Sequence, residues 1–303
     1  MGPTASGKTD LACRLVQDFP LEIISVDSAM IYRGMDIGTA KPDSQILAQA
    51  PHHLLDIIDP PESYSAARFC DDVSRLSKEI VACGKYPLLV GGTMMYFRAL
   101  QQGLSVLPPA NEDIRNQLLQ DAQTRGWDFL HQQLLTIDPG SAARIHPHDT
   151  QRLQRALEVY LATGTTLTEH LKSQTAVGVY QFVNLTLMPT DRSWLHARIA
   201  CRFEQMLAQG LISEVEQLLS KWHLTASNPA MRSVGYRQVI SYLSNEYDYT
   251  TLCIKGVAAT RQLAKRQLTW LRHWPHAYNF EADNPKSGAE IMALIRQILD
   301  NHP

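Results

Sequence analysis

The sequence GPTASGKT occupies residues 2–9, directly after Met1, and fits the phosphate-loop pattern G-x-x-x-x-G-K-[ST]. In this pattern, backbone N–H groups of the glycine-rich loop and of the following helix N-terminus point at a bound anion. Lys8 adds a positive charge, and the hydroxyl of Thr9 is suited to Mg²⁺. The alternative is a glycine-rich helix entry without chemical function. The predicted diphosphate-binding residues are Gly2, Pro3, Thr4, Ala5, Ser6, Gly7, Lys8 and Thr9, with Thr9 as the Mg²⁺ ligand.

The residues that follow the loop predict a parallel sheet with crossover helices. Apolar residues recur at helical spacing after Lys8 until Pro20 ends the helix. LEIISV (21–26) and PLLVGG (87–92) are mainly apolar stretches typical of buried strands, and residues 65–83 between them have a helical pattern. Strand, helix and strand at this spacing favour an α/β fold whose core is a parallel sheet like that of the P-loop NTPases, flanked by helices.

No strand precedes the loop in this sequence, because only Met1 stands before Gly2. A strand that leads into a phosphate loop normally lies inside its sheet, and its removal would expose the neighbouring ladders. We therefore expect Met1 to be an internal methionine of a product that carries an apolar strand upstream.

The chain changes character near LPPA (107–110), where a polar sequence with a helical pattern begins. From Asn111 to about Lys172 we expect three or four helices, which form an all-helical lobe inserted into the core. QFVNLTLM (181–188) should return the chain to the sheet as a strand. The predicted domains are residues 1–109 as the first part of the core, 110–179 as the inserted lobe, and 180–303 as the second part of the core.

Helices are expected to dominate from Ser193 to about Trp274. AYNF (277–280) is predicted to form a last short strand, and residues 287–300 a closing helix.

Composition and charge narrow the class of protein. The 303 residues are 45% hydrophobic and 19% charged, which is typical of globular chains. The formal net charge is −2, so a nucleic acid would have to bind a local basic patch. Five cysteines without a C-x-x-C pair favour reduced thiols in a cytoplasmic protein. No apolar run approaches the roughly 20 residues of a membrane span, and no signal peptide is recognisable.

Four motifs occur along the chain: GPTASGKT (2–9), VDSAMIYRGMDIGTAKP (26–42), LLVGGTMMY (88–96) and RSVGYRQ (232–238). Together they resemble the tRNA dimethylallyltransferases, over nearly the whole chain from Gly2 to about Trp270. The resemblance departs at the N-terminus, where the family has the strand that is missing here. It implies a P-loop core with an inserted helical lobe that closes over the tRNA.

The resemblance also implies the reaction. The dimethylallyl group of dimethylallyl diphosphate passes to N6 of the adenine that lies 3′ of the anticodon in tRNA, and Mg²⁺ is the cofactor. The adenine amino group is a poor nucleophile, so the enzyme must mainly stabilise charge on the departing diphosphate. The loop N–H groups, Lys8 and Mg²⁺ on Thr9 suit that task, and the resemblance adds Arg202. Arg198 lies one helical turn before Arg202 and can share its face; for either arginine the alternative is a solvated side chain.

Asp27 directly follows the predicted strand at 21–26. Open α/β sheets bind ligands at the carboxyl ends of their strands, where a carboxylate can orient the amine and take its proton. The resemblance gives Asp27 the same role, and the alternative is a helix N-cap or turn aspartate. The predicted catalytic residues are therefore Asp27, Lys8, Thr9 and Arg202.

The tRNA, through its anticodon stem-loop, should meet cationic and aromatic side chains. Residues 249–280 contain no acidic residue but several lysines and arginines, with Trp270 and Trp274 interleaved; a solvated helix face over core tryptophans is the alternative. The resemblance places DSAM (27–30), QRLQR (151–155) and RSVGYR (232–237) against the tRNA. The predicted tRNA-binding residues are Asp27, Ser28, Ala29, Met30, Thr93, Arg115, Gln151, Arg152, Leu153, Gln154, Arg155, Arg232, Ser233, Val234, Gly235, Tyr236 and Arg237.

Two other functions would use parts of the same sequence. A small-molecule or nucleoside kinase would bind ATP at the loop, but LLV (88–90) is followed by Gly-Gly-Thr where many P-loop NTPases carry a metal-binding aspartate. A noncatalytic RNA-binding protein has no need for Asp27 beside an intact Lys8–Thr9 pair. The two histidines of HPH (146–148) are too few for zinc, so we expect none. A monomer is the default assembly.

Overall fold

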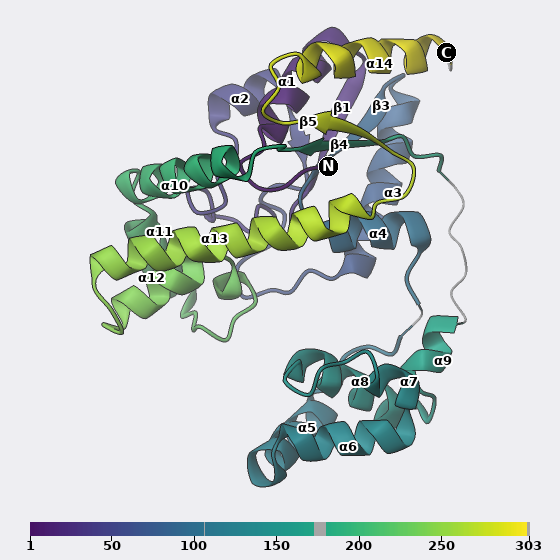
Figure 1. Cartoon of the computed structure of the whole chain (residues 1–303), viewed down its shortest axis with the longest axis vertical. Coiled ribbons are helices and arrows are strands. Elements are labelled where there is room, and N and C mark those ends of the chain that lie inside the picture. The colour runs from purple at the N-terminus through teal and green to yellow at the C-terminus, as the bar shows by residue number, and fades with distance from the viewer. Residues whose placement is uncertain (106, 173–179, 302–303) are drawn as a thin grey trace. The chain divides into compact units, whose positions relative to one another are not determined.

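The computed structural model describes residues 1–105, 107–172 and 180–301, and the chain divides into two compact units (Figure 1). The core unit comprises Met1–Ala99 and Tyr180–Pro303, and the helical lobe comprises Leu100–Val179. The first boundary thus falls before Leu100, whereas the sequence pattern placed it before Ala110.

The first part of the core unit alternates helices and strands: α1 (Lys8–Asp18), β1 (Leu21–Val26), α2 (Ser44–Gln49), β2 (His52–His53), α3 (Ala66–Ala82), β3 (Tyr86–Gly91) and α4 (Met94–Gln102), whose last residues enter the lobe. The second part contains β4 (Asn184–Met188), α10 (Arg192–Ala208), α11 (Leu211–Trp222), the 3₁₀ helix η1 (Ala230–Arg232), α12 (Tyr236–Leu243), α13 (Tyr249–Arg272), β5 (Ala277–Glu281) and α14 (Ser287–Asn301). The predicted strands and helices of the core are therefore confirmed.

A parallel three-stranded sheet in the order β2-β1-β3 forms the first layer of the core. β1 pairs with β3 along its whole length, from Leu21 opposite Tyr86 to Val26 opposite Gly91. Ile23, Ile24 and Val26 are fully buried, as expected for a central strand whose two faces are covered by helices. This register brings the carboxyl ends of β1 and β3 to the same edge of the sheet.

The prediction that the strand at 181–188 returns to this sheet is wrong. Within the described residues, β5 is the only strand that pairs with β4, in a separate parallel two-stranded sheet. At the other edge of β4, the Met1 amino group donates to the carbonyl of Leu185 at 2.7 Å, and the Leu187 N–H donates to the carbonyl of Met1 at 2.9 Å. Met1 therefore pairs with β4 as one residue of a strand would. The expected upstream strand stays a prediction.

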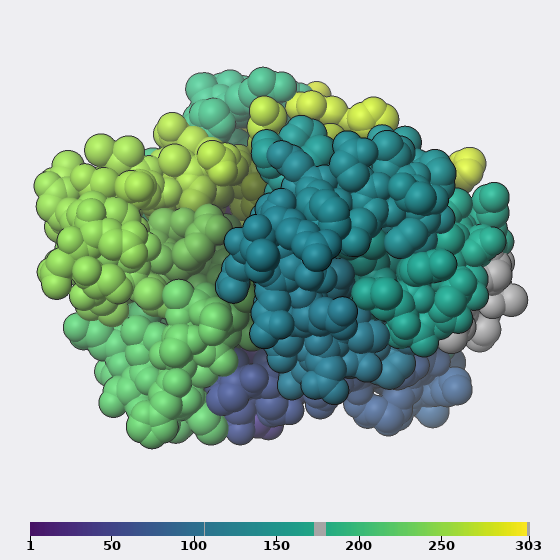
Figure 2. All heavy atoms as spheres, turned by 90° about the horizontal axis from the view of Figure 1, so that it is seen from below, coloured from purple at the N-terminus to yellow at the C-terminus, as the bar shows by residue number. Residues whose placement is uncertain are grey.

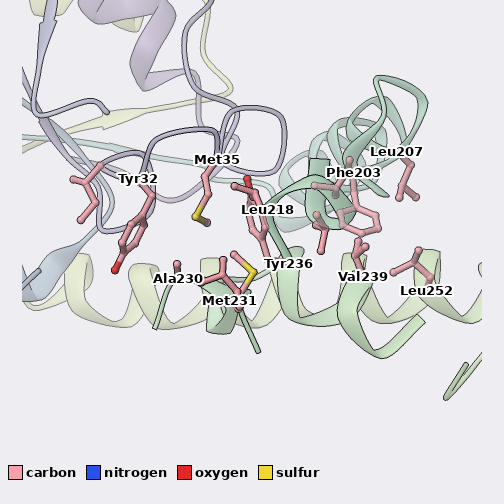
Figure 3. Close-up of a cluster of buried hydrophobic side chains, with 14 of the residues drawn as sticks. Tyr32, Met35, Phe203, Leu207, Leu218, Ala230, Met231, Tyr236, Val239 and Leu252 are labelled. Carbon is pink, nitrogen blue, oxygen red and sulfur yellow. The ribbon is translucent and has the colours of Figure 1, made fainter. Parts of the chain in front are cut away.

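An extensive buried cluster joins the segment after β1 to the helices of the second part (Figure 3). It contains Tyr32 and Met35 from that segment, Phe203 from α10 and Tyr236 from α12. The approach of α10 to α13 is close, because a Cβ added at Gly256 would lie 1.9 Å from the Phe203 ring. This packing fixes the segments 26–42 and 232–238 against the same group of helices.

The helical lobe contains α5 (Glu112–Arg125), α6 (Trp127–Ile137), α7 (Pro139–Ala142), α8 (Thr150–Thr163) and α9 (Leu167–Lys172). The lobe has more helices than the three or four expected. Pro139 does not interrupt the chain between two helices but begins an additional short helix, α7, for which Asp138 is the N-cap. The lobe has its own apolar core, which includes the fully buried Leu130, Leu134 and Leu153. None of the helices described in either unit has the length and apolar composition that a membrane span requires.

Candidate active site

The glycine-rich loop folds back in front of α1 through two left-handed residues, Ala5 with φ 62° and Gly7 with φ 87°. Gly2 lies so close to β4 that a Cβ there would come within 2.8 Å of the Leu187 carbonyl oxygen. Lys8 and Thr9 form the first turn of α1. The loop thus leads into a helix N-terminus, whose unpaired N–H groups favour an anion.

A cavity of about 480 Å³ brings together residues that are far apart in the sequence. The loop supplies Thr4, Ala5, Lys8 and Thr9, and the strand ends supply Asp27–Met30 and Thr93; Arg202 comes from α10, and Arg232–Tyr236 form a further wall. All the residues that line this cavity belong to the core unit. The predicted phosphate loop, carboxylate and RSVGY motif therefore share one cavity.

The two carboxylate oxygens of Asp27 have different surroundings. Its Oδ1 accepts hydrogen bonds from the backbone N–H groups of Ala29 at 2.8 Å and Met30 at 3.2 Å, so it is a turn aspartate. Its Oδ2 has no hydrogen bond within the described parts of the chain, and Asp27 also lines the cavity. The adjacent Ser28 N–H donates to the Thr93 hydroxyl at 3.2 Å, which joins the ends of β1 and β3.

Two partly buried cations lie near Asp27. Burial and the charge of Arg202 lower the pKa of Lys8, Asp27 acts in the opposite direction, and the resulting pKa is about 8. Burial also lowers the pKa of Arg202, again opposed by Asp27. The Lys8 Nζ donates to the Pro3 carbonyl at 2.6 Å, so its ammonium lies along the loop. Two cations and one carboxylate leave a positive excess, which suits an anionic ligand.

The residues present fit a Mg²⁺ ion that is bound mainly through its substrate. Thr9 lines the cavity beside the loop, and its hydroxyl is an oxygen ligand of the kind that Mg²⁺ prefers. In the described ranges, no group of three or more histidine, cysteine, aspartate or glutamate side chains is arranged to hold a metal. Substrate phosphates and water would have to provide most of the ligands, as is usual for Mg²⁺.

Two side chains from the second part of the core hold the loop backbone. Gln267 on α13 accepts the Thr4 N–H at 2.8 Å through Oε1 and donates from Nε2 to the Gly92 carbonyl at 2.9 Å. Arg198 on α10 donates to the Ala5 carbonyl at 2.8 Å, with its guanidinium stacked on Trp194. Arg198 therefore positions the loop, whereas Arg202 lines the cavity.

Sequence reasoning missed Gln267. The helical spacing was an available signal, because it places Gln267 on one face with Leu263, Arg266 and Trp270. In the structure, all of these residues line the cavity. Gln267 is only 9% exposed, although its neighbours Arg266 and Trp270 are exposed. A buried amide among cationic and aromatic residues of one helix face indicates a specific hydrogen-bonding role.

The basic segment at residues 249–280 is partly a solvated helix face, as the alternative interpretation held. Lys255, Arg261 and Lys265 are exposed and do not line the cavity, whereas Arg266 and Trp270 do. Side chains of α11 to α13 form the green to yellow-green surface in Figure 2. Arg237 is exposed on α12 and also lies outside the cavity lining.

The predicted tRNA contacts of the lobe differ among themselves. Gln151 and Arg152 are exposed, and Arg152 pairs with Asp149 at 3.1 Å. Gln154 donates to the carbonyl of Arg115 at 3.1 Å. The prediction for Leu153 is wrong for its side chain, which is fully buried in the core of the lobe.

Arg115 and Arg155 have a partner that the sequence did not reveal. The fully buried carboxylate of Glu158 accepts from the Asn111 N–H at 2.7 Å, from Arg115 at 3.1 Å and from Arg155 at 2.9 Å. Burial alone would raise the pKa of Glu158, but the Asn111 N–H and the Arg155 guanidinium lower it below its ordinary value. Both arginines therefore stabilise the lobe, and their contact with tRNA stays a prediction.

The fold and the cavity define a class: an α/β protein with a P-loop-like core and a cationic cavity at the carboxyl edge of its sheet, where such folds bind ligands. Within that class, the chain belongs to the IPP transferase family, whose model matches residues 30–274.

Comparison with individual proteins agrees with this family. The chain is 60% identical to a tRNA dimethylallyltransferase of Legionella pneumophila (strain Corby), over 99% of this chain and 96% of the relative. It is 54% identical to a tRNA dimethylallyltransferase of Thioalkalivibrio sulfidiphilus, over 99% of this chain and 94% of the relative. The resemblance recognised in the sequence is confirmed.

Solved structures show the same fold. A tRNA isopentenylpyrophosphate transferase of Bacillus halodurans superposes with a TM-score of 0.72 at 36% identity, covering 99% of this chain and 95% of the other. A eukaryotic dimethylallyltransferase, described as acting on tRNA, superposes with a TM-score of 0.83 at 25% identity, covering 100% of this chain and 79% of the other. The expected α/β fold class is confirmed.

Proposed function

We propose that this protein transfers the dimethylallyl group of dimethylallyl diphosphate to N6 of the adenine 3′ of the anticodon in tRNA. The products are N6-isopentenyladenosine in the tRNA and free diphosphate. The observation that carries this proposal is the single cavity that joins the glycine-rich loop to Asp27 and to the segment Arg232–Tyr236. Diphosphate, base and proton acceptor can meet only in such a cavity.

The bond between the allylic carbon and the diphosphate oxygen breaks as the bond from that carbon to N6 forms. Negative charge grows on the departing diphosphate, and preorganised donors stabilise such charge strongly in a site of low dielectric constant. The loop N–H groups, Lys8 and Arg202 supply those donors. Mg²⁺, held at the Thr9 hydroxyl, would add Lewis-acid stabilisation of the same oxygens.

N6 carries an additional positive charge once it is alkylated, and it must lose a proton. Asp27 takes this proton on Oδ2, while Oδ1 keeps its hydrogen bonds to the turn at Ala29 and Met30. Because the turn fixes the carboxylate, the proton acceptor is already oriented toward the cavity.

The adenine must leave the stack of the anticodon loop to reach the cavity, which costs only a few kcal/mol for an unpaired base. The segments Asp27–Met30 and Arg232–Tyr236, together with Thr93, are proposed to receive it. Arg266 and Trp270 at the cavity, and Gln151 and Arg152 on the lobe, are proposed to contact phosphates and bases of the stem-loop.

We also propose that the protein acts in the cytoplasm, where its tRNA substrate is found, and as a monomer.

One assay separates this function from the alternatives. The protein is mixed with Mg²⁺, unmodified tRNA and radiolabelled dimethylallyl diphosphate, and a parallel reaction contains ATP in place of the prenyl donor. We expect label in the tRNA and no ATP turnover. ATP turnover without label transfer would replace this proposal with the kinase, and tRNA binding without either reaction would replace it with a noncatalytic RNA-binding protein. Omission of Mg²⁺, with chelator present, should abolish the transfer.

A further inference from the structure

Glu214 on α11 accepts four hydrogen bonds, although it does not line the cavity. Its Oε2 accepts from the backbone N–H groups of Asp36 at 3.0 Å and Ile37 at 2.7 Å. Its Oε1 accepts from the Gly38 N–H at 3.1 Å and from the Tyr236 hydroxyl at 2.6 Å. Both carboxylate oxygens are therefore fully engaged.

These bonds join two motifs that are distant in sequence. Gly38 and Thr39 belong to the motif at 26–42, Tyr236 belongs to RSVGYRQ, and all three residues line the cavity. The segments 36–39 and 232–236 also touch directly, because a Cβ added at Gly38 would lie 2.5 Å from the Tyr236 ring. Glu214 thus connects these two segments without lining the cavity itself.

The surroundings of Glu214 favour a rigid connection between the two segments. Tyr236 is fully buried, and both its burial and the adjacent Glu214 carboxylate raise the pKa of its phenol, so it stays a donor. The buried Lys41 ammonium holds the same segment by pairing with Asp36 and Asp56 and donating to the Tyr32 carbonyl. Neither of the two segments includes the glycine-rich loop.

We propose that Glu214 is a positioning residue that sets the spacing between the segments 36–39 and 232–236, and thereby the fit of the tRNA base. The inference rests on the proposed function, since that function makes one of these two segments, Arg232–Tyr236, part of the receptor for the base, while Gly38 and Thr39 of the other segment line the same cavity. It implies that Glu214 affects the use of tRNA and leaves the binding of dimethylallyl diphosphate unchanged.

The test compares E214Q with the matched control E216Q in the full-length protein. Glutamine keeps the volume of the side chain but replaces one acceptor oxygen with a donor that faces other donors. Glu216 is exposed on the same helix. The measurements are the steady-state KM for tRNA, the Kd for tRNA, the Kd for dimethylallyl diphosphate and the melting temperature.

For E214Q we expect the KM and the Kd for tRNA to rise by about tenfold or more, the size of effect expected for one lost hydrogen bond to a charged group. The Kd for dimethylallyl diphosphate should equal that of the wild type, and E216Q should match the wild type throughout. Unchanged tRNA parameters in E214Q would overturn the inference, as would an equal loss of affinity for both substrates.

Y236F provides a second, milder variant in case E214Q does not fold. It removes only one of the four bonds, and we expect the KM and the Kd for tRNA to rise by about threefold; wild-type values would overturn the inference. Failure of the proposed function would be visible separately, as the absence of label transfer by the wild-type protein. The Kd values for tRNA would then still decide whether Glu214 positions an RNA-binding surface.

Discussion

Asp27 has a structural contact on one carboxylate oxygen and a proposed chemical role on the other. Oδ1 fixes the turn that presents Ala29 and Met30 to the cavity, whereas Oδ2 is the proposed proton acceptor. Replacement by alanine would remove both contributions and would confuse a folding effect with a catalytic one. The two contributions can be separated only by a variant that keeps an acceptor for the turn.

Asp27→Asn is such a variant, because its amide oxygen can still accept the Ala29 and Met30 N–H groups but its amide nitrogen cannot take a proton. We expect kcat to fall by about 100- to 10,000-fold, the usual range for loss of a general base. The Kd for tRNA should stay close to that of the wild type, as measured by filter binding. A kcat near the wild-type value would remove Asp27 as the base.

The lowered pKa of Lys8 predicts that the binding of dimethylallyl diphosphate depends on pH. Burial lowers its pKa to about 8, so its ammonium is charged below that pH and loses its charge as the pH rises through it. The Kd for dimethylallyl diphosphate, measured by calorimetry from about pH 7 to 9.5, should therefore rise above pH 8. Lys8→Met should bind more weakly and show a flat profile over the same range. An identical slope in both proteins would assign the titration to another group.

At the scale of elements, α13 connects the glycine-rich loop with the strand ends. Its buried Gln267 bonds to Thr4 of the loop and to Gly92 after β3. A Cβ at Gly92 would come within 2.4 Å of the Gln267 amide nitrogen, so the helix and the turn are in close contact. The position of the loop thus depends on a helix that follows it by more than two hundred residues in the sequence.

Gln267→Met tests this connection, because methionine has a similar volume but leaves the Thr4 N–H and the Gly92 carbonyl without a partner. An unsatisfied buried group costs about 1–3 kcal/mol, so the Kd for dimethylallyl diphosphate should rise by about tenfold or more. Gln262→Met, exposed on the same helix, is the control. If Gln267→Met binds the diphosphate as tightly as the control does, α13 does not position the loop.

Much of the core could be predicted from the sequence because its strands are mainly apolar stretches, as at Leu21–Val26. The pairing of β4 could not, since its partner β5 lies far along the chain. Motifs located Asp27 and the loop. Glu158 has Arg155 on its own helix, but its other partners are Asn111, the N-cap of α5, and Arg115 on that helix. The partners of Glu214 and Gln267 also come from other elements, so these roles depend on tertiary contacts that no local pattern encodes.

Each of the two units has an apolar core of its own. Every residue that lines the cavity belongs to the core unit. Glu158, Arg115 and Arg155 form their network within the helical lobe. The proposed contributions of the two units should therefore be separable, with diphosphate binding in one unit and part of tRNA binding in the other.

Glu158→Ala tests this separation. It leaves the Asn111 N–H and two arginines without their acceptor, and we expect the free energy of unfolding of the lobe to fall by about 1–3 kcal/mol. The Kd for tRNA should rise, and the Kd for dimethylallyl diphosphate should not change. Glu112→Gln, at the exposed first turn of α5, is the control. A weaker diphosphate complex in Glu158→Ala would contradict the separation.

The same carboxylate predicts how acid affects the lobe. The folded-state pKa of Glu158 lies below its ordinary value of 4.5, so its contribution to stability is complete above that pH and is lost as the pH falls through the folded-state pKa. The melting temperature of the wild type should therefore fall more steeply with acid than that of Glu158→Ala. Parallel curves for the two proteins would show that Glu158 does not contribute.

The contact between Gly256 and the Phe203 ring has a consequence for genetics. A single added methyl group at Gly256 would force α10 away from α13, and both helices carry residues of the cavity. Random mutagenesis with selection for loss of tRNA modification should thus recover Gly256 alleles, although this glycine touches no substrate in the proposed complex. Such alleles would identify a position that activity requires although it does not line the cavity.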